Sequence, residues 1–336
     1  MKKFLRFCKK TVLDIIYRVS YKVVTLKPDR ALEDLPLGKF FRLDIPTYDG
    51  SGQAVHPSLL VQDGGQTQSN SPRFVLSFTP YTDTDDRVEN PSVVISDDGL
   101  SFREEKAGLN PLVPAPEKDH NDDPELFFAD GKYCILYLET MRPEKQSLIL
   151  LESADRIHWD KRVLHVEDLT QGHSCFMLSP TYVEKDGVAY LFYVNRDAEG
   201  GYRIEHVTGK DIYSLDFGTR NPVKVVNLKD ELPWHLAILP RKADDMPGGG
   251  YIMLLTTASD AEKDAWYTLH LARSSNLTDW ELDSEFALSD CYRSSGFVRD
   301  GVLYMYVSKI FLPAWRRKRW NILLYKAKLP EVWRKE

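Results

Sequence analysis

Polar segments with side chains suited to acid–base chemistry recur five times along the chain, each just ahead of an apolar run. They open at His56, Asp123, Ser179, Trp234 and Ser294, at intervals of 55 to 67 residues. Carboxylates and imidazoles are the usual general acids and bases of enzymes. The recurring segments are therefore where we look first for a site.

Asp123 and Glu89 are the best candidates for a catalytic carboxyl pair, and His235 is a third catalytic candidate. Two carboxyl groups on either side of a reacting bond can divide the roles of general acid and general base. The imidazole of His235 titrates near neutral pH and follows Trp234, an aromatic platform. In the alternative interpretation, Glu89 caps its loop, Asp123 accepts backbone hydrogen bonds and His235 is structural.

Further residues of these segments and of the loop at 79–92 are expected to bind a substrate. They are His56, Asp86, Arg87, Asp122, Glu125, Thr181, Trp234 and Arg293. The chain has neither a His-Glu-x-x-His motif nor a glycine-rich phosphate loop, so we expect no metal site and no cofactor. The alternative is a central Ca²⁺ ion near His56, His120, Asp122, Asp123 and His235, because carboxylates suit that ion.

The repeat also predicts the elements that position these residues. Asp-Gly turns at 130–131, 186–187 and 300–301 follow the first apolar run of their repeats, as in tight β-hairpins. A period of this length with about four strands per unit is typical of a propeller blade. We expect an all-β, five-bladed β-propeller over residues 31–336, in which the five polar segments meet at one end of the axis. Residues 37–47 are expected to close the ring against the last blade.

Residues 1–30 are expected to form a basic amphipathic helix. Segment 2–22 carries seven Lys or Arg residues against one Asp, with apolar residues at helical spacing. It either binds an anionic membrane surface or packs on the propeller wall. Its charges interrupt any apolar stretch, so we expect a cytoplasmic protein, which membrane binding by this helix would make peripheral at the inner membrane. The net charge of −6 argues against nucleic acid as a partner.

The sequence Asp123-Pro124-Glu125-Leu126 ahead of Asp130-Gly131-Lys132-Tyr133 resembles the five-bladed propeller glycoside hydrolases. These include the arabinanase and β-xylosidase family (family 43) and the invertase-like families, and the repeat pattern is similar over about residues 50–330. The resemblance implies an oligosaccharide or polysaccharide ligand and acidic residues at the openings of the first, third and fourth blades. His56, Ser179 and His235 stand there instead, so the usual catalytic set is not intact.

Two functions remain open. One is a carbohydrate-active enzyme, glycosidase-like or glycan-processing, in surface polysaccharide metabolism. The other is a non-catalytic propeller that binds a glycan or a partner protein and is tethered to a membrane by its N-terminal helix. A carboxyl pair at catalytic spacing would favour the enzyme, and a funnel filled by Arg87 and Arg293 would favour the binding protein.

Overall fold

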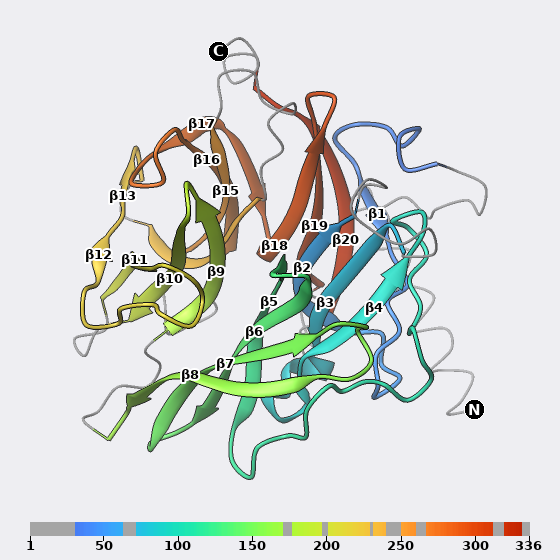
Figure 1. Ribbon diagram of the computed structural model, residues 1–336. Coiled ribbons are helices and arrows are strands. Elements are labelled where there is room, and N and C mark those ends of the chain that lie inside the picture. The colour runs from blue at the N-terminus through green and yellow to red at the C-terminus, as the bar shows by residue number, and fades with distance from the viewer. Residues whose placement is uncertain are drawn as a thin grey trace.

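Five β-sheets surround a common centre in the computed structural model (Figure 1). It describes residues 31–62, 72–170, 177–196, 201–228, 231–239, 250–259, 267–311 and 319–330. The expected all-β, five-bladed β-propeller is confirmed. The helix expected for residues 1–30 lies outside the described residues, and the domain boundary at residue 30 stays a prediction. Within the described ranges, no helix is long and apolar enough to cross a membrane.

Each blade is one largely antiparallel sheet whose consecutive strands run outward from an innermost strand. The first blade contains β2 (Ala54–Val61), β3 (Phe74–Pro80) and β4 (Ser92–Ser96). The second blade contains β5 (His120–Ala129), β6 (Lys132–Met141), β7 (Lys145–Ser153) and β8 (Asp160–Asp168). The third blade contains β9 (Met177–Lys185), β10 (Val188–Arg196), β11 (Tyr202–Gly209) and β12 (Asn221–Pro222). The fourth blade contains β14 (Leu232–Ile238), β15 (Tyr251–Ala258), β16 (Tyr267–Ser274), β17 (Asp279–Ser289) and, at its outer edge, β13 (Lys224–Val226). The fifth blade contains β18 (Cys291–Arg299), β19 (Val302–Phe311), β20 (Arg319–Lys328) and, at its outer edge, β1 (Phe40–Arg42). Two short 3₁₀ turns, η1 (Thr82–Thr84) and η2 (Asp86–Val88), lie between β3 and β4.

The ring is closed by a strand from the start of the described chain. β1 pairs antiparallel with β20, with Phe41 opposite Leu324, so the predicted closure by residues 37–47 is confirmed. In Figure 1 the blue β1 lies beside the red β20. The fourth blade differs from the simple repeat, because β13 arrives from the third blade and pairs parallel with β17.

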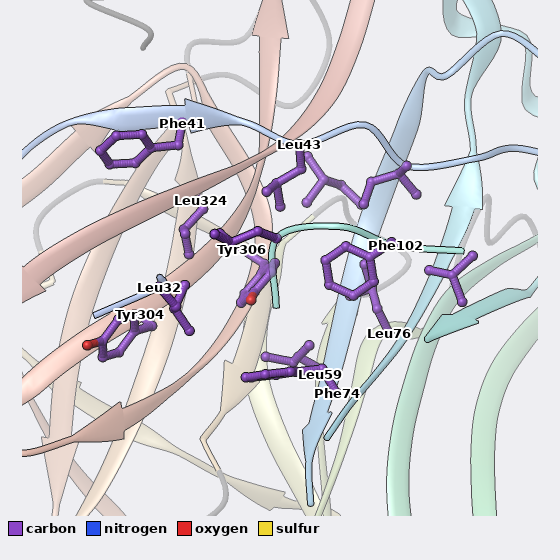
Figure 2. Packing of buried hydrophobic residues seen from close by; sticks show 14 of the residues in the cluster. Leu32, Phe41, Leu43, Leu59, Phe74, Leu76, Phe102, Tyr304, Tyr306 and Leu324 are labelled. Carbon is purple, nitrogen blue, oxygen red and sulfur yellow. The ribbon is translucent and has the colours of Figure 1, made fainter. Parts of the chain in front are cut away.

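The core lies between the blades, which explains why the strands are apolar on both faces. Figure 2 shows the cluster at the ring closure, where Leu32, Phe41 and Leu43 pack against side chains of the first and fifth blades. Phe74, Phe41 and Tyr306 in this cluster are fully buried. Hydrophobic packing between neighbouring blades thus keeps the inner strands in a fixed ring.

Each innermost strand meets its neighbour with a register shift near its opening. The shifts fall at 55–58, 122–125, 178–181, 233–235 and 291–294 of the inner strands. A β-bulge leaves an unpaired residue and turns its side chain away from the regular ladder. His56, Asp123 and Ser179 occupy these irregular positions with φ of +53°, +51° and +51°. The irregularities therefore supply the backbone geometry of the site.

Candidate functional site

Side chains from three blades converge at the axis in what we call the axial cluster: His56, Asp123 and His235. Oδ1 of Asp123 lies 3.6 Å from Nε2 of His56 and 3.4 Å from Nδ1 of His235. The two imidazole rings are 5.2 Å apart between centroids. All three residues are buried, with Asp123 at 0% exposure. The expected convergence of these openings is thus observed.

The carboxylate of Asp123 is held in one orientation by the neighbouring blades. Its Oδ2 accepts a hydrogen bond of 2.8 Å from the backbone N–H of Ser179, and its Oδ1 accepts one of 3.4 Å from Nη1 of Arg293. Oγ of Ser179 also lies 2.6 Å from Nδ1 of His235. Ser179, which opens the third repeat, therefore orients both the carboxylate of Asp123 and the imidazole of His235.

The electrostatics of the axial cluster favour neutral imidazoles beside an ionised carboxylate. Burial lowers the pKa of His235 to about 4 and also lowers the pKa of His56. Burial alone would raise the pKa of Asp123, but His235, His56 and Arg293 hold it well below its usual range. At neutral pH the cluster therefore has the protonation state in which His and Asp side chains bind metal ions.

Arg293 fills the centre of the ring beneath this cluster. It is fully buried, and its Nη2 donates to Oε2 of Glu125 at 2.9 Å and to the carbonyl of Pro180 at 3.2 Å. Burial raises the pKa of Glu125 to about 7, although Arg293 and Ser58 oppose that shift. Arg293 and Glu125 thus join the second, third and fifth blades below the reactive groups.

Glu89 reaches the axial cluster through His56. Its Oε2 accepts a hydrogen bond of 3.0 Å from Oγ1 of Thr79 and lies 3.3 Å from Nδ1 of His56. Burial raises the pKa of Glu89 to about 8, so this carboxyl group is largely protonated at neutral pH. Because His56 contacts Glu89 with one ring nitrogen and Asp123 with the other, an imidazole stands between the two expected catalytic carboxyl groups.

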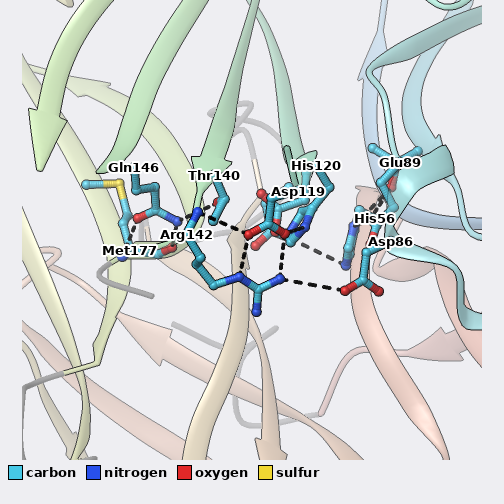
Figure 3. Close-up of polar contacts among 12 residues, drawn as sticks. His56, Asp86, Glu89, Asp119, His120, Thr140, Arg142, Gln146 and Met177 are labelled. Atoms are coloured by element: carbon cyan, nitrogen blue, oxygen red, sulfur yellow. Dashed lines mark hydrogen bonds and ion pairs between the residues drawn. The ribbon is translucent and has the colours of Figure 1, made fainter. Parts of the chain in front are cut away.

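Charged residues of the first and second blades form the acidic side of the site: Asp86, Glu89, Asp119, His120, Asp122 and Arg142. Figure 3 shows Arg142 between Asp119 and Asp86; its Nε and Nη2 both donate to Asp119 at 2.5 Å. Nε2 of His120 lies 3.2 Å from Oδ2 of Asp122. Burial alone would lower the pKa of His120, but Asp122, Glu89 and Asp119 raise it to about 10.

Rings from the other blades form the aromatic side: Tyr81, Tyr202, Trp234, Tyr267, Tyr292 and Trp320. Tyr292 contacts His235 edge-to-face at 4.1 Å, and Nε1 of Trp234 donates to the hydroxyl of Tyr292 at 3.0 Å. Tyr267 lies 6.0 Å from Trp234 and 4.9 Å from Tyr292 between ring centroids. The axial cluster thus has an acidic flank and an aromatic flank.

The structure brings most of the expected binding residues to this region, with two differences. Arg87 turns away: its side chain is 83% exposed and paired with Asp85. Thr181 is buried, and its Oγ1 donates a hydrogen bond of 3.4 Å to the carbonyl of Leu236 instead of contacting the cluster. Ser179 and Tyr292 contact the cluster instead. Ser179 is marked in the sequence only as the opening of the third repeat, and no feature of the sequence points to Tyr292.

The axial cluster is also the better of two possible metal sites among the described residues. One ring nitrogen each from His56 and His235 and one carboxylate oxygen of Asp123 lie within 4.8 Å of one another. Nε2 of each imidazole is buried without a hydrogen-bond partner. The second group, Asp86, Asp119 and His120, has the guanidinium of Arg142 against both carboxylates. Two imidazoles and one carboxylate suit Zn²⁺ or another transition-metal ion better than Ca²⁺.

Comparison with known proteins shows the fold of the chain. No family model matches the chain, and no curated protein matches it. An N-acetylgalactosamine deacetylase from F. plautii, in complex with blood group B trisaccharide, superposes with a TM-score of 0.72 at 18% identity, covering 87% of this chain and 95% of that one.

Glycoside hydrolases share the same architecture at a greater structural distance. A thermostable family-43 glycoside hydrolase superposes with a TM-score of 0.56 at 14% identity, covering 82% of this chain and 89% of that one. An α-L-arabinanase from Cellvibrio cellulosa, complexed with arabinohexaose, gives a TM-score of 0.52 at 13% identity, covering 81% and 91%. The chain has the five-bladed fold expected from the sequence resemblance, and of these three structures the deacetylase is the most similar.

Proposed function

We propose that the protein is a glycan-processing hydrolase that removes an acyl group, such as acetyl, from a sugar at the axial cluster. The observation that carries the proposal is the convergence of His56, Asp123 and His235 with two unpartnered imidazole nitrogens. The likeness to an N-acetylgalactosamine deacetylase supports an amide or ester bond as the target.

A divalent metal ion fits this site. His56, Asp123 and His235 would be its three protein ligands, leaving room for water or substrate, as in catalytic zinc sites. Such an ion would polarise the acyl carbonyl and activate water for attack. Ser179 and Arg293 would hold Asp123 in place, and the carboxyl group of Glu89 would accept a hydrogen bond from Nδ1 of His56 and so fix the orientation of that ring.

The positions of the carboxyl groups argue against simple cleavage of a glycosidic bond. Asp123 is fully buried and His56 separates it from Glu89, whereas a glycosidase needs its two carboxyl groups on either side of the substrate. A rearranged glycosidase remains the competing enzyme, with Asp122 as its remaining acid beside Asp123.

Product analysis separates these two reactions. Purified protein is incubated with N-acetylated and O-acetylated oligosaccharides, and released acetate and new reducing ends are measured together. Acetate without new reducing ends is expected. New reducing ends without acetate would contradict the proposal and support a glycosidase.

Metal dependence gives a second test. Protein stripped with a chelator is assayed, and its thermal stability is followed, as Zn²⁺, Mn²⁺, Co²⁺ or Ca²⁺ is added. We expect one of the transition-metal ions to raise both acetate release and melting temperature, with a weaker response in His235→Gln. Full activity in the stripped protein would remove the metal from the proposal.

A second candidate is a non-catalytic glycan-binding protein, favoured by Arg293. This buried guanidinium forms ion pairs with both Asp123 and Glu125, so it ties two carboxyl groups of the site into the packing of the axis. Oligosaccharide binding by calorimetry without any product, in every metal tested, would support this candidate.

We also propose that segment 2–22 brings the protein to an anionic membrane surface on the cytoplasmic side, where it would act in surface polysaccharide metabolism. The support is the excess of Lys and Arg over Asp in this segment. Full-length protein should sediment with anionic vesicles in a salt-sensitive way, and protein lacking residues 1–30 should not. Equal sedimentation of the two would contradict the proposal.

A further inference from the structure

The ring of Tyr292 contacts both the axial cluster and the other rings of the aromatic side. We propose that Tyr292 contacts the substrate, with its phenolic hydroxyl donating a hydrogen bond to the carbonyl oxygen of the acyl group that is hydrolysed. The inference rests on the proposed function, and it adds a residue that recognises the acyl group. The strand geometry at Tyr292, the contacts of its ring and the bonding of its hydroxyl each point to this role.

The backbone fixes the position of Tyr292 at the opening of β18. The register of β18 against β19 shifts at 291–294, and Tyr292 lies in this irregular stretch beside Arg293. The carbonyl oxygen of Tyr292 accepts hydrogen bonds from Oγ1 of Thr256 at 3.1 Å and from Oγ of Ser294 at 2.9 Å. An irregular strand opening re-aims side chains, and here the backbone is tied to the fourth and fifth blades, which restricts where the phenol can point.

The ring of Tyr292 packs directly on the axial cluster. Its centroid lies 4.1 Å from that of His235 and 5.4 Å from that of His56. The rings of Tyr267 and Trp320 each lie 4.9 Å from it between centroids. Tyr292 remains partly exposed although four rings surround it. A substrate group that reaches both imidazoles therefore lies next to this phenol.

The hydroxyl of Tyr292 is oriented by an acceptor bond and keeps its own hydrogen for another partner. It accepts a hydrogen bond of 3.0 Å from Nε1 of Trp234. An indole N–H can only donate, whereas a phenol both accepts and donates, so this bond leaves the hydroxyl hydrogen unused. Within the described part of the chain, that hydrogen has no acceptor. The phenol thus offers an oriented donor to a carbonyl oxygen of a ligand.

A donor at this position suits the hydrolysis of an acyl group. The reaction adds the oxygen of water to the acyl carbon, breaks the bond from that carbon to the nitrogen or oxygen of the sugar, and transfers a proton from the water to that leaving atom. Negative charge grows on the carbonyl oxygen during the attack, and a fixed donor stabilises this charge more than it stabilises the uncharged carbonyl. Tyr292 should therefore affect turnover more strongly than substrate binding.

Binding to chelator-treated protein tests the contact without any turnover. N-acetylated oligosaccharides, and matched oligosaccharides with a hydroxyl in place of the acetamido group, are titrated by calorimetry. We expect Tyr292→Phe to weaken binding of the acetylated sugar about fivefold and to leave binding of the hydroxyl-bearing sugar unchanged. Tyr182→Phe, at a partly exposed tyrosine of the third blade whose ring stacks on Phe127, should bind both sugars like the unaltered protein.

Kinetics separate a contact with the substrate from mere support of Trp234. Tyr292→Phe should lower the turnover of metal-loaded protein about 10²-fold, both in the unaltered background and in Trp234→Phe, which lacks the indole donor. If the hydroxyl served only to hold the indole, Tyr292→Phe would cause no further loss in Trp234→Phe, and the inference would be wrong.

The outcomes distinguish this inference from the proposed reaction. If Tyr292→Phe selectively weakens binding of the acetylated sugar while no acetate is released with any metal, the contact stands and the proposed reaction fails. If acetate is released and Tyr292→Phe changes neither turnover nor binding, the reaction stands and the contact fails. Equal weakening of binding for the acetylated and the hydroxyl-bearing sugar would show that Tyr292 only supports the fold of the site, and would also overturn the inference.

Discussion

Asp123 is the residue on which both the chemistry and the packing of the axis depend. It contacts His56 from the first blade, Ser179 from the third, His235 from the fourth and Arg293 from the fifth. Its positive φ adds a backbone requirement, because Asn and Asp tolerate the left-handed region better than other non-glycine residues. Substitutions at this position should therefore separate charge from backbone geometry.

We predict that Asp123→Asn lowers turnover by about 10²-fold or more, because the amide cannot replace the charged ligand. It should also lower the free energy of unfolding by about 1–3 kcal/mol, since Arg293 loses a buried hydrogen-bond acceptor of opposite charge. Steady-state kinetics and denaturant unfolding measure the two effects. Asp97→Asn, a 73% exposed carboxylate outside the site, is the matched control. Undiminished turnover in Asp123→Asn would remove Asp123 from the mechanism.

His206 gives a prediction at a residue outside the site. Its ring packs on Phe192 at 5.1 Å, its Nδ1 has no partner, and burial lowers its pKa below 6.5. The unfolded chain therefore binds a proton more readily than the folded protein does, so His206 reduces stability as pH falls below about 6.5. His206→Gln should flatten the fall in unfolding free energy between about pH 7 and pH 5. An unchanged slope in His206→Gln would contradict this assignment.

At the scale of strands, the sequence period predicts the inner strands well, because each opening and its apolar run are local features. The bulges are harder to predict: His56, Asp123 and Ser179 have positive φ although none is glycine. A shift of one residue turns a side chain to the other face of a strand. This explains why Ser179, rather than the expected Thr181, reaches the axial cluster. The parallel pairing of β13 with β17 involves three residues far apart in sequence from their partners, so no local pattern indicates it.

A close approach between β18 and β19 gives a prediction for an element. Gly296 lies where a Cβ atom would come within 2.1 Å of the carbonyl oxygen of Tyr304 on β19. Gly296→Ala should force the two strands apart and lower the free energy of unfolding by about 1–3 kcal/mol or more. Denaturant unfolding measures this loss. Gly218→Ala is the control, because there the nearest atom is the end of the Asp216 side chain.

For the whole molecule, stability depends on closing the ring. Beyond the pairing of β1 with β20, Nζ of Lys326 donates to the carbonyls of Leu32 and Glu33 at 3.2 and 2.7 Å. Leu32, Leu35 and Phe41 are buried against the first and fifth blades. The closure therefore combines strand pairing, side-chain contacts and apolar burial in a segment of about fifteen residues.

We predict that deleting residues 1–45 causes loss of cooperative unfolding or a large fall in melting temperature, because β20 loses its partner and the first and fifth blades lose shared core. Deleting residues 1–30 should leave the melting temperature nearly unchanged. Calorimetry of the two shortened proteins is the measurement. Similar melting of the 1–45 deletion and the full chain would show that the blades hold the ring without β1.

The same closure constrains the order in which the elements of the protein can pair during synthesis. During synthesis β1 emerges before any blade is complete, yet its partner β20 is translated about 280 residues later, so β1 waits unpaired while four blades form. Contacts of such long sequence separation form slowly, and exposed strand edges invite association with other chains. The axial cluster draws on the first, second and fourth blades, so it can be assembled only after most of the chain has left the ribosome.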